Sequence, residues 1–430
     1  MINDALISMP RKELIFLISL WLVVVTMPIS GSLHSASIIL LGLVWIFQQH
    51  FKNIKRVLNA RFMASLFFYG LFVVGLLYTS DMKSGLFQLE QKISLFAFPL
   101  IFCTVPEMRR GSLKLVFSSF VLVCFIAALY CLSAGVMANY RSNGLNHVDV
   151  PYYTNQDLAS YMGAHSTYLS IYMAFSALVI MDELRQHKIS TSRKFLYVGM
   201  ILFFVFFLFL LSSRIVILTF LLLFAVTLVR AVFKEKLNKM LVAASALALI
   251  IVAVTFSQSD YFKNRFSQIY NFNTADLVGS DHENGVSQRV FFWKNALRVI
   301  GNSALYGHGT GDADMEMKRG YEAFLSENPQ APESVVKAVH YFIEHHYNAH
   351  NQYLQVLILF GFLGLSVFLF MILNAYYTAF QHKDLLHASF LTIIFFACLT
   401  ECVLDRQAGV IFYAFFNSIF LFRSAKEFRS

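Results

Sequence analysis

Long, uninterrupted apolar runs dominate this sequence and limit the folds that are open to it. The runs at 13–29, 112–133 and 214–230 contain few charged residues, and each is close to the roughly 20 residues that a helix needs to cross a bilayer. The runs are continuous and do not alternate between polar and apolar residues, which argues against a transmembrane β-barrel. The sequence therefore predicts an all-α polytopic membrane protein.

The composition agrees with this prediction. Hydrophobic residues make up 57% of the chain and charged residues only 14%, whereas soluble domains carry roughly 25% charged residues. A cytosolic enzyme and a disordered chain are both excluded by this balance. The net charge is +9, but the basic residues form short clusters between apolar runs, so we predict no nucleic-acid partner. No CxxC pair is present, so neither a zinc knuckle nor a disulfide framework is indicated.

We predict about twelve transmembrane helices. Their expected ranges are 13–29, 34–49, 61–78, 92–105, 112–133, 163–181, 196–212, 214–230, 240–257, 351–377, 386–403 and 407–423. The first run is followed by no small-residue cleavage site, so we interpret it as a retained helix. The stretch 196–230 is too long for one crossing and is interrupted only at 212–214, which predicts two helices joined by a very tight turn.

The basic residues also predict the orientation. With the N-terminus inside, most of the 34 Lys and Arg residues fall in the segments predicted to be cytoplasmic, so both termini are predicted to be cytoplasmic. The segment 258–350 then becomes a large extracytoplasmic loop folded over the outer face, and its amphipathic stretch 287–300 predicts a helix. We divide the chain into helices 1–9 (1–257), this loop with catalytic elements (258–350), and helices 10–12 with the C-terminus (351–430).

Two arginines are candidates for binding an anion. Arg214 lies between two apolar runs in LSSRIVI, and a guanidinium offers a fixed fork of donors that suits phosphate oxygens. The alternative is an interfacial arginine that extends to lipid headgroups. Arg289 lies in SQRVFFWKNALRVI, where the alternative is an ordinary solvated charge. An ionisable residue at membrane depth is costly and therefore indicates function.

His350, where the long loop meets the next span, is the candidate general base, because an imidazole titrates near neutrality. A purely structural histidine is the alternative. His346 would share a helical face with His350, but no HExxH motif is present and we predict no metal. Other polar candidates lie at the same predicted face, namely Glu401, Arg406, His165 and Lys92. The glycines of YGHGTGD predict a close turn beside the site, not a dinucleotide loop.

Taken together and in their order along the chain, these features resemble those of the O-antigen ligase and polymerase (Wzy_C-type) superfamily of membrane glycosyltransferases. The resemblance rests on about twelve spans, an arginine directly after a span (Arg214) and an arginine before an aromatic helix (Arg289). It further includes the glycine turn GHGTG and a His-Asn-x-x-Leu segment that begins with His350 and Asn351. The early segment GLLYTSDMKSGLFQLEQKISLFAFPL also looks like members of the ligase branch.

The resemblance implies a GT-C-like fold in the bacterial inner membrane and an active site on the periplasmic face. It implies transfer of a glycan from undecaprenyl diphosphate to an acceptor hydroxyl, with inversion and without a metal or other cofactor. In the ligase branch the acceptor is a lipid A-core sugar. Carried over to this chain, Arg214 and Arg289 hold the diphosphate and His350 is the base. The substrate-binding candidates are Lys92, His165, Asn351, Glu401 and Arg406.

Alternatives remain at this stage. A polymerase of the same superfamily would use the same chemistry on the end of another carrier-linked glycan, and a protein O-oligosaccharyltransferase would use a protein acceptor. A transporter of lipid-linked glycans is an alternative from another class, although the two halves of the chain show no repeat. A non-catalytic scaffold or sensor whose loop binds glycan is a further alternative.

Overall fold

The computed structural model describes residues 9–29, 31–144, 147, 149–186, 189–233 and 285–423. Within these ranges the regular structure is entirely helical, without a strand. The predicted span 240–257, the first part of the long loop and both chain termini lie outside the described residues.

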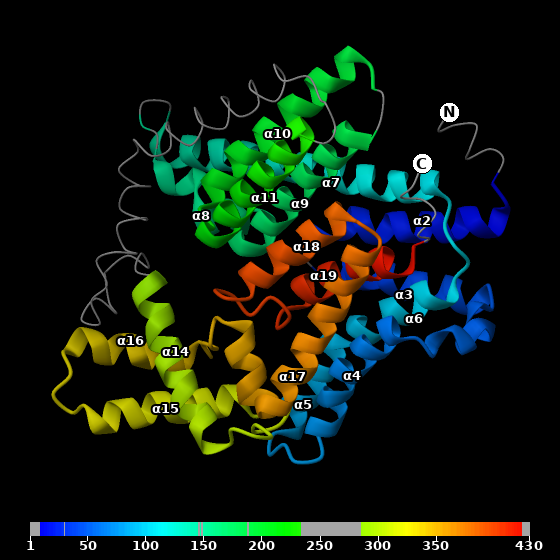
Figure 1. Cartoon of the computed structure of the whole chain (residues 1–430). Helices are drawn as coiled ribbons and strands as arrows, with labels where there is room; N and C mark the ends of the chain where they lie inside the picture. The colour runs from blue at the N-terminus through cyan, green and yellow to red at the C-terminus, as the bar shows by residue number, and fades with distance from the viewer. Residues whose placement is uncertain are drawn as a thin grey trace.

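The described helices lie in two stretches of the sequence, before residue 234 and after residue 284, and helices of the two stretches pack on each other. The first comprises α2 (Arg11–Thr26), α3 (Ser32–Phe47), η1 (His50–Val57), α4 (Ala60–Gly75), α5 (Met82–Lys92), α6 (Ser94–Thr104), α7 (Arg110–Asn143), η2 (Val150–Tyr153), α8 (Asn155–Ser160), α9 (Ser166–Gln186), α10 (Thr191–Leu211) and α11 (Arg214–Phe233). The second comprises α14 (Gly285–Asn302), α15 (Ala313–Glu327), α16 (Glu333–Glu344), α17 (Gln352–Gln381), α18 (Leu385–Ala397) and α19 (Gln407–Phe422). Figure 1 shows α14, α15 and α16 gathered at one end of the molecule.

The prediction of an all-helical membrane protein is confirmed. By length and composition, 5 helices of the described chain can cross a membrane, or up to 6 if the bent pair η1 and α4 forms one span. Shorter apolar helices cover Leu33–Phe47, Leu385–Ala397 and Gln407–Phe422. Every predicted span within the described residues overlaps a helix. The total of twelve spans and the GT-C-like arrangement stay predictions.

Helix α19 lies at the centre of the helical bundle (Figure 1). It is buried continuously from Gly409 to Leu421, which explains why its sequence is apolar on every side. The Phe416 ring meets Phe120 of α7 and Phe175 of α9 edge-on, with both centroid distances 4.9 Å. Such edge-to-face contacts between aromatic rings are favourable beyond the area they bury. Phenylalanines of α7, α9 and α19 thus form an aromatic cluster that joins helices distant in the sequence.

The described part of the long loop is folded. Helix α14 covers the stretch 287–300 that was predicted to be an amphipathic helix, and that prediction is confirmed. Its apolar face packs on α15 and α16, because Phe291 stacks on Tyr321 at 5.8 Å and Phe292 meets Phe342 edge-on at 4.9 Å. These aromatic contacts hold α14 in place and so fix the position of Arg289 on it.

Helix α17 is interrupted at Gly361, whose φ of 59° and ψ of −159° are not helical. A Cβ at this position would lie 2.4 Å from the carbonyl carbon of Leu305, so the close approach of another backbone requires glycine. The interruption is compensated by hydrogen bonds from the segment after α14: the amides of His308 and Gly309 donate to the carbonyls of Ile358 and Leu359, both at 2.9 Å.

The glycine turn of YGHGTGD therefore packs against α17, and it also contacts the turn between α4 and α5. Asp312 ends this segment, and its carboxylate accepts hydrogen bonds from the amides of Ser80 and Asp81 and from the Thr79 hydroxyl, at 2.7 to 3.0 Å. The expectation of a close turn is correct, but these residues do not line the cavity described below. The turn has a structural role instead, because it satisfies backbone groups that the interruption in α17 leaves unpaired.

Asp312→Asn is expected to destabilise the protein by about 1–3 kcal/mol, because an amide nitrogen would face buried N–H donors that need an acceptor. The thermal midpoint of the detergent-solubilised protein measures this. Glu333→Gln is the matched control, since its side chain is largely exposed at 82%. Equal midpoints for the two variants would contradict the role given to Asp312.

Candidate functional site

A cavity of about 1340 Å³ lies where the first residues of α14 meet the first residues of α9 and α11 and the segment between α18 and α19. Its wall is built from six separate stretches of chain, within 151–157, 165–167, 212–218, 285–293, 345–350 and 400–406. All of them were predicted from the charge pattern to lie at the extracytoplasmic ends of helices or in extracytoplasmic segments. The fold thus brings segments that are distant in sequence to one polar site.

Most of the side chains that the sequence indicated line this cavity. They are Arg214, Arg289, His350, His165, Glu401 and Arg406. The wall therefore combines three guanidinium groups, at least one buried carboxylate and imidazole rings, which is a composition suited to an anionic ligand and to proton transfer.

Arg214 is the first residue of α11. Ser212 ends α10 with a left-handed φ of 56°, and the carbonyl of Ser213 accepts a hydrogen bond from the amide of Ile217 at 2.9 Å. The very tight turn predicted between the two helices is thereby confirmed. Helices α9 and α11 both begin at the cavity, at Ser166 and Arg214, so two positive helix ends face the same space. Both ends favour an anion there.

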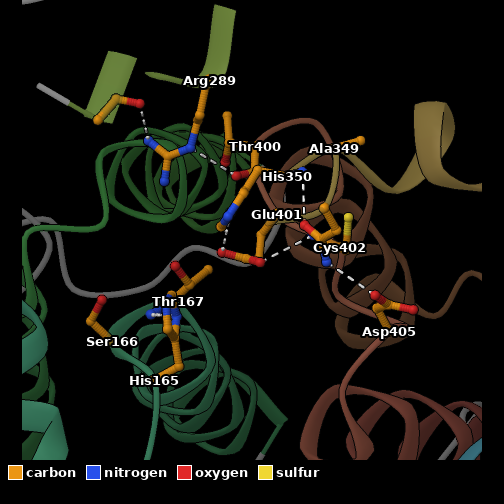
Figure 2. Close-up of polar contacts among 12 residues, drawn as sticks. His165, Ser166, Thr167, Arg289, Ala349, His350, Thr400, Glu401, Cys402 and Asp405 are labelled. Atoms are coloured by element: carbon orange, nitrogen blue, oxygen red, sulfur yellow. Dashed lines mark hydrogen bonds and ion pairs between the residues drawn. The ribbon is translucent and has the colours of Figure 1, made fainter. Parts of the chain in front are cut away.

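Arg289 projects from the first turns of α14 toward the segment between α18 and α19 (Figure 2). Its Nε donates to the carbonyl of Thr400 at 3.0 Å, and one terminal nitrogen donates to the carbonyl of Gly285 at 3.3 Å. Both acceptors are neutral backbone carbonyls, and these two contacts orient the guanidinium at the cavity wall. Arg289 is thus a fixed cationic group in the cavity wall.

His350 lies in the turn between α16 and α17. Its φ of 43° is left-handed, and its amide donates to the Asn348 side chain at 3.0 Å. The ring stacks on Phe292 at a centroid distance of 5.4 Å and an interplanar angle of 24°. A non-glycine residue in this conformation costs free energy, and such residues occur preferentially at functional sites.

The prediction that His346 and His350 share one face of a helix is wrong. Both residues follow the end of α16 and both have left-handed φ values, 51° for His346, so neither is helical. Among the described residues, no group of three or more His, Cys, Asp or Glu side chains is arranged to hold a metal ion.

Glu401 lies beside His350, with 3.6 Å between its Oε2 and the histidine Nδ1. Figure 2 shows the ring directed at this carboxyl, with Arg289 and His165 nearby. Burial, the largest single influence, raises the pKa of the Glu401 carboxyl, but His350, His165 and Arg289 together outweigh it and the pKa falls to about 2. Burial lowers the pKa of His165 to about 4, so that ring is neutral at pH 7.

The structure does not bring Lys92 and Asn351 into the cavity wall. Lys92 is buried, lies 3.3 Å from Asp405 and sits over the Phe72 ring at 5.3 Å. Asn351 caps α17, since its side-chain oxygen accepts from the amides of Tyr353 and Leu354. Both residues instead stabilise the segments that carry the cavity residues.

Two residues that position His350, Phe292 and Asn348, were not predicted from the sequence. Phe292 follows Arg289 by three positions, so helical spacing indicates that both share one face of α14. Asn348 accepts the amide two residues later, a common local pattern for asparagine. It also donates to Asp405 at 3.0 Å, which connects it to Lys92, and no local pattern reveals a contact over such a distance in sequence.

One known protein family matches part of the chain. Residues 199–369 match the family model described as O-antigen ligase. The match includes Arg214, Arg289 and His350, whereas His165, Glu401 and Arg406 lie outside it. None of the curated proteins compared with the chain matches it. The matched family is one of ligase- and polymerase-type membrane glycosyltransferases. The resemblance inferred from the sequence is therefore confirmed by a match of residues 199–369 to the O-antigen ligase family model.

Proposed function

We propose that this protein is an O-antigen ligase-like glycosyltransferase of the bacterial inner membrane. It transfers a glycan from undecaprenyl diphosphate to the hydroxyl of an acceptor, a lipid A-core sugar, on the periplasmic face. The observation that carries this proposal is that one cavity is lined by Arg214, Arg289 and His350, which come from three separate parts of the matched segment.

Two arginines bind the leaving group in this proposal. As the bond between the anomeric carbon and the phosphate oxygen breaks, its electron pair stays with the lipid diphosphate, and that charge must be stabilised. Arg289 is held on neutral carbonyls, and Arg214 stands at the positive end of α11. Fixed guanidinium groups supply what a divalent cation supplies in other enzymes, so we propose a reaction without a metal or other cofactor.

His350 acts as the general base. A sugar hydroxyl is a weak nucleophile, and a neutral imidazole takes its proton while the oxygen attacks the anomeric carbon. Attack opposite to the departing diphosphate inverts the configuration at that carbon. His165, Glu401 and Arg406 complete the wall around the reacting groups, and the lipid carrier lies among the apolar helices. Lys92 and Asn351 contribute by stabilising the segments around His350.

His350→Ala is expected to lower glycan transfer by about 10²–10⁴-fold, the usual contribution of a positioned general base. Surface glycolipids from a strain lacking this protein, complemented with the variant, are separated on a gel. His340→Ala is the matched control, because this histidine is exposed on α16 and does not line the cavity.

The same gel separates the candidate functions. Loss of all polymer from the lipid A core, with long chains accumulating on the carrier, supports ligation. A core that carries one repeat without a longer ladder identifies a polymerase instead. Normal ladders with His350→Ala contradict the base assignment.

Arg214→Lys is expected to reduce transfer by roughly 10²-fold, because an ammonium group does not reproduce the two-pronged donor of a guanidinium. Initial rates with purified enzyme and carrier-linked glycan measure the change. Arg298→Lys is the control, since Arg298 is exposed on α14, pairs with Glu327 and lies outside the cavity. Wild-type rates for Arg214→Lys would remove Arg214 from the diphosphate site.

Transfer by the purified protein is expected to persist in excess EDTA, because the proposed charge stabilisation comes from arginine alone. Rates are compared with and without the chelator, and after adding back Mg²⁺ or Mn²⁺. Activity that disappears with EDTA and returns with a single divalent ion would overturn the metal-free mechanism.

A further inference from the structure

The two carboxylate oxygens of the buried Glu401 side chain have different neighbours. One oxygen accepts a hydrogen bond from the amide of Cys402 at 3.3 Å, and the other, Oε2, lies 3.6 Å from His350 Nδ1. Neither Oε2 nor Nδ1 has a hydrogen-bond partner among the described residues, although both atoms are fully buried. Unsatisfied buried polar atoms are rare, so a facing pair of them indicates a contact that shortens when the site is occupied.

The rest of His350 is already fixed. Its amide is held by Asn348, and its ring plane is held against Phe292. Tyr347 adds a second aromatic contact at 5.7 Å. With backbone and ring plane fixed, the remaining variable is which ring nitrogen carries the proton and which one is free to accept another. A carboxylate beside Nδ1 settles that choice, because it accepts Nδ1–H and leaves the lone pair on Nε2.

Glu401 remains charged in this setting. The pKa of its carboxyl is held at about 2, against the effect of burial, by His350, with smaller contributions from His165 and Arg289. The preceding residue, Thr400, accepts the hydrogen bond from Arg289. Two consecutive residues of one segment therefore contact the histidine and one of the arginines.

Resting on the proposed function, we infer that Glu401 is a positioning residue that orients the His350 imidazole for proton abstraction. Glu401 holds the proton on Nδ1, and Nε2 takes the proton of the acceptor hydroxyl. The acceptor oxygen then forms its bond to the anomeric carbon, and the bond from that carbon to the diphosphate breaks. The resulting imidazolium is stabilised by the adjacent carboxylate. Glu401 itself touches neither substrate.

The test is steady-state kinetics on the purified full-length protein, with a carrier-linked oligosaccharide as donor and a lipid A-core acceptor. Glu401→Ala is expected to lower kcat by about 10²-fold, with the KM of each substrate changed less than about twofold, because only the base is affected. Glu401→Gln is expected to be intermediate, since its amide oxygen still accepts from Nδ1–H. Glu344→Gln is the matched control, an exposed glutamate on α16 outside the cavity.

Added formate provides a readout that a merely structural role would not produce. It is expected to raise the kcat of Glu401→Ala at least severalfold and to leave wild type and Glu344→Gln unchanged, because the small carboxylate occupies the space left beside Nδ1. Thermal midpoints accompany the kinetics. If Glu401→Ala does not fold, the isosteric Glu401→Gln carries the kinetic test.

Raised KM values with unchanged kcat would overturn the inference in favour of direct substrate binding. Loss of kcat that follows the thermal midpoint, without rescue by formate, would overturn it in favour of a structural role. Wild-type kcat in both variants would also overturn it. If the wild-type protein itself transfers no glycan between these substrates, the proposed function fails instead, so the two failures are distinguished.

Discussion

The irregular segment between α18 and α19 depends on side chains and backbone of α17 for its hydrogen bonds, and the site depends on that segment. Gln352, at the start of α17, donates its amide to the Cys398 carbonyl at 2.8 Å, and its side-chain oxygen accepts the amide of Leu404 at 2.6 Å. Non-helical backbone inside a membrane protein persists only where the protein satisfies its polar groups. Because Gln352 binds both ends of the segment, Glu401 is held at a fixed place beside His350.

A buried ion pair secures the same region from another direction. Lys92 is 1% exposed, and its partner Asp405 also accepts a hydrogen bond from Asn348. Breaking such a pair by removing one partner leaves an uncompensated buried charge, which costs several kcal/mol. The pair therefore does more than stabilise the bundle, because Asn348 also holds the His350 amide. Lys92, a substrate-binding candidate by its sequence, thus supports the segment that carries His350.

Local patterns in the sequence were enough to predict many elements. The amphipathic stretch 287–300 became α14, and the serines before Arg214 became the turn between α10 and α11, because both follow from residue spacing within a short window. The docking of Gly307 and Gly309 on α17, and the contact of Asn348 with Asp405, join residues far apart in the chain. Such tertiary contacts leave no periodic signal. His346 and His350 were assigned a shared helical face because their spacing of four residues fits a helix, but α16 ends at Glu344, before both of them.

The interruption of α17 at Gly361 divides the helix into two parts that share one neighbouring segment. The segment after α14 is hydrogen-bonded to α17 on both sides of Gly361. Before it, the carbonyls of Ile358 and Leu359 accept from the amides of His308 and Gly309. Beyond it, the amide of Phe362 donates to the carbonyl of Ala304 at 2.9 Å. The backbone hydrogen bonds that are lost at the non-helical Gly361 are thus replaced by bonds to a segment from elsewhere in the chain. That segment begins where α14 ends, so the interruption links α17, whose first turn follows His350, to the helix that carries Arg289.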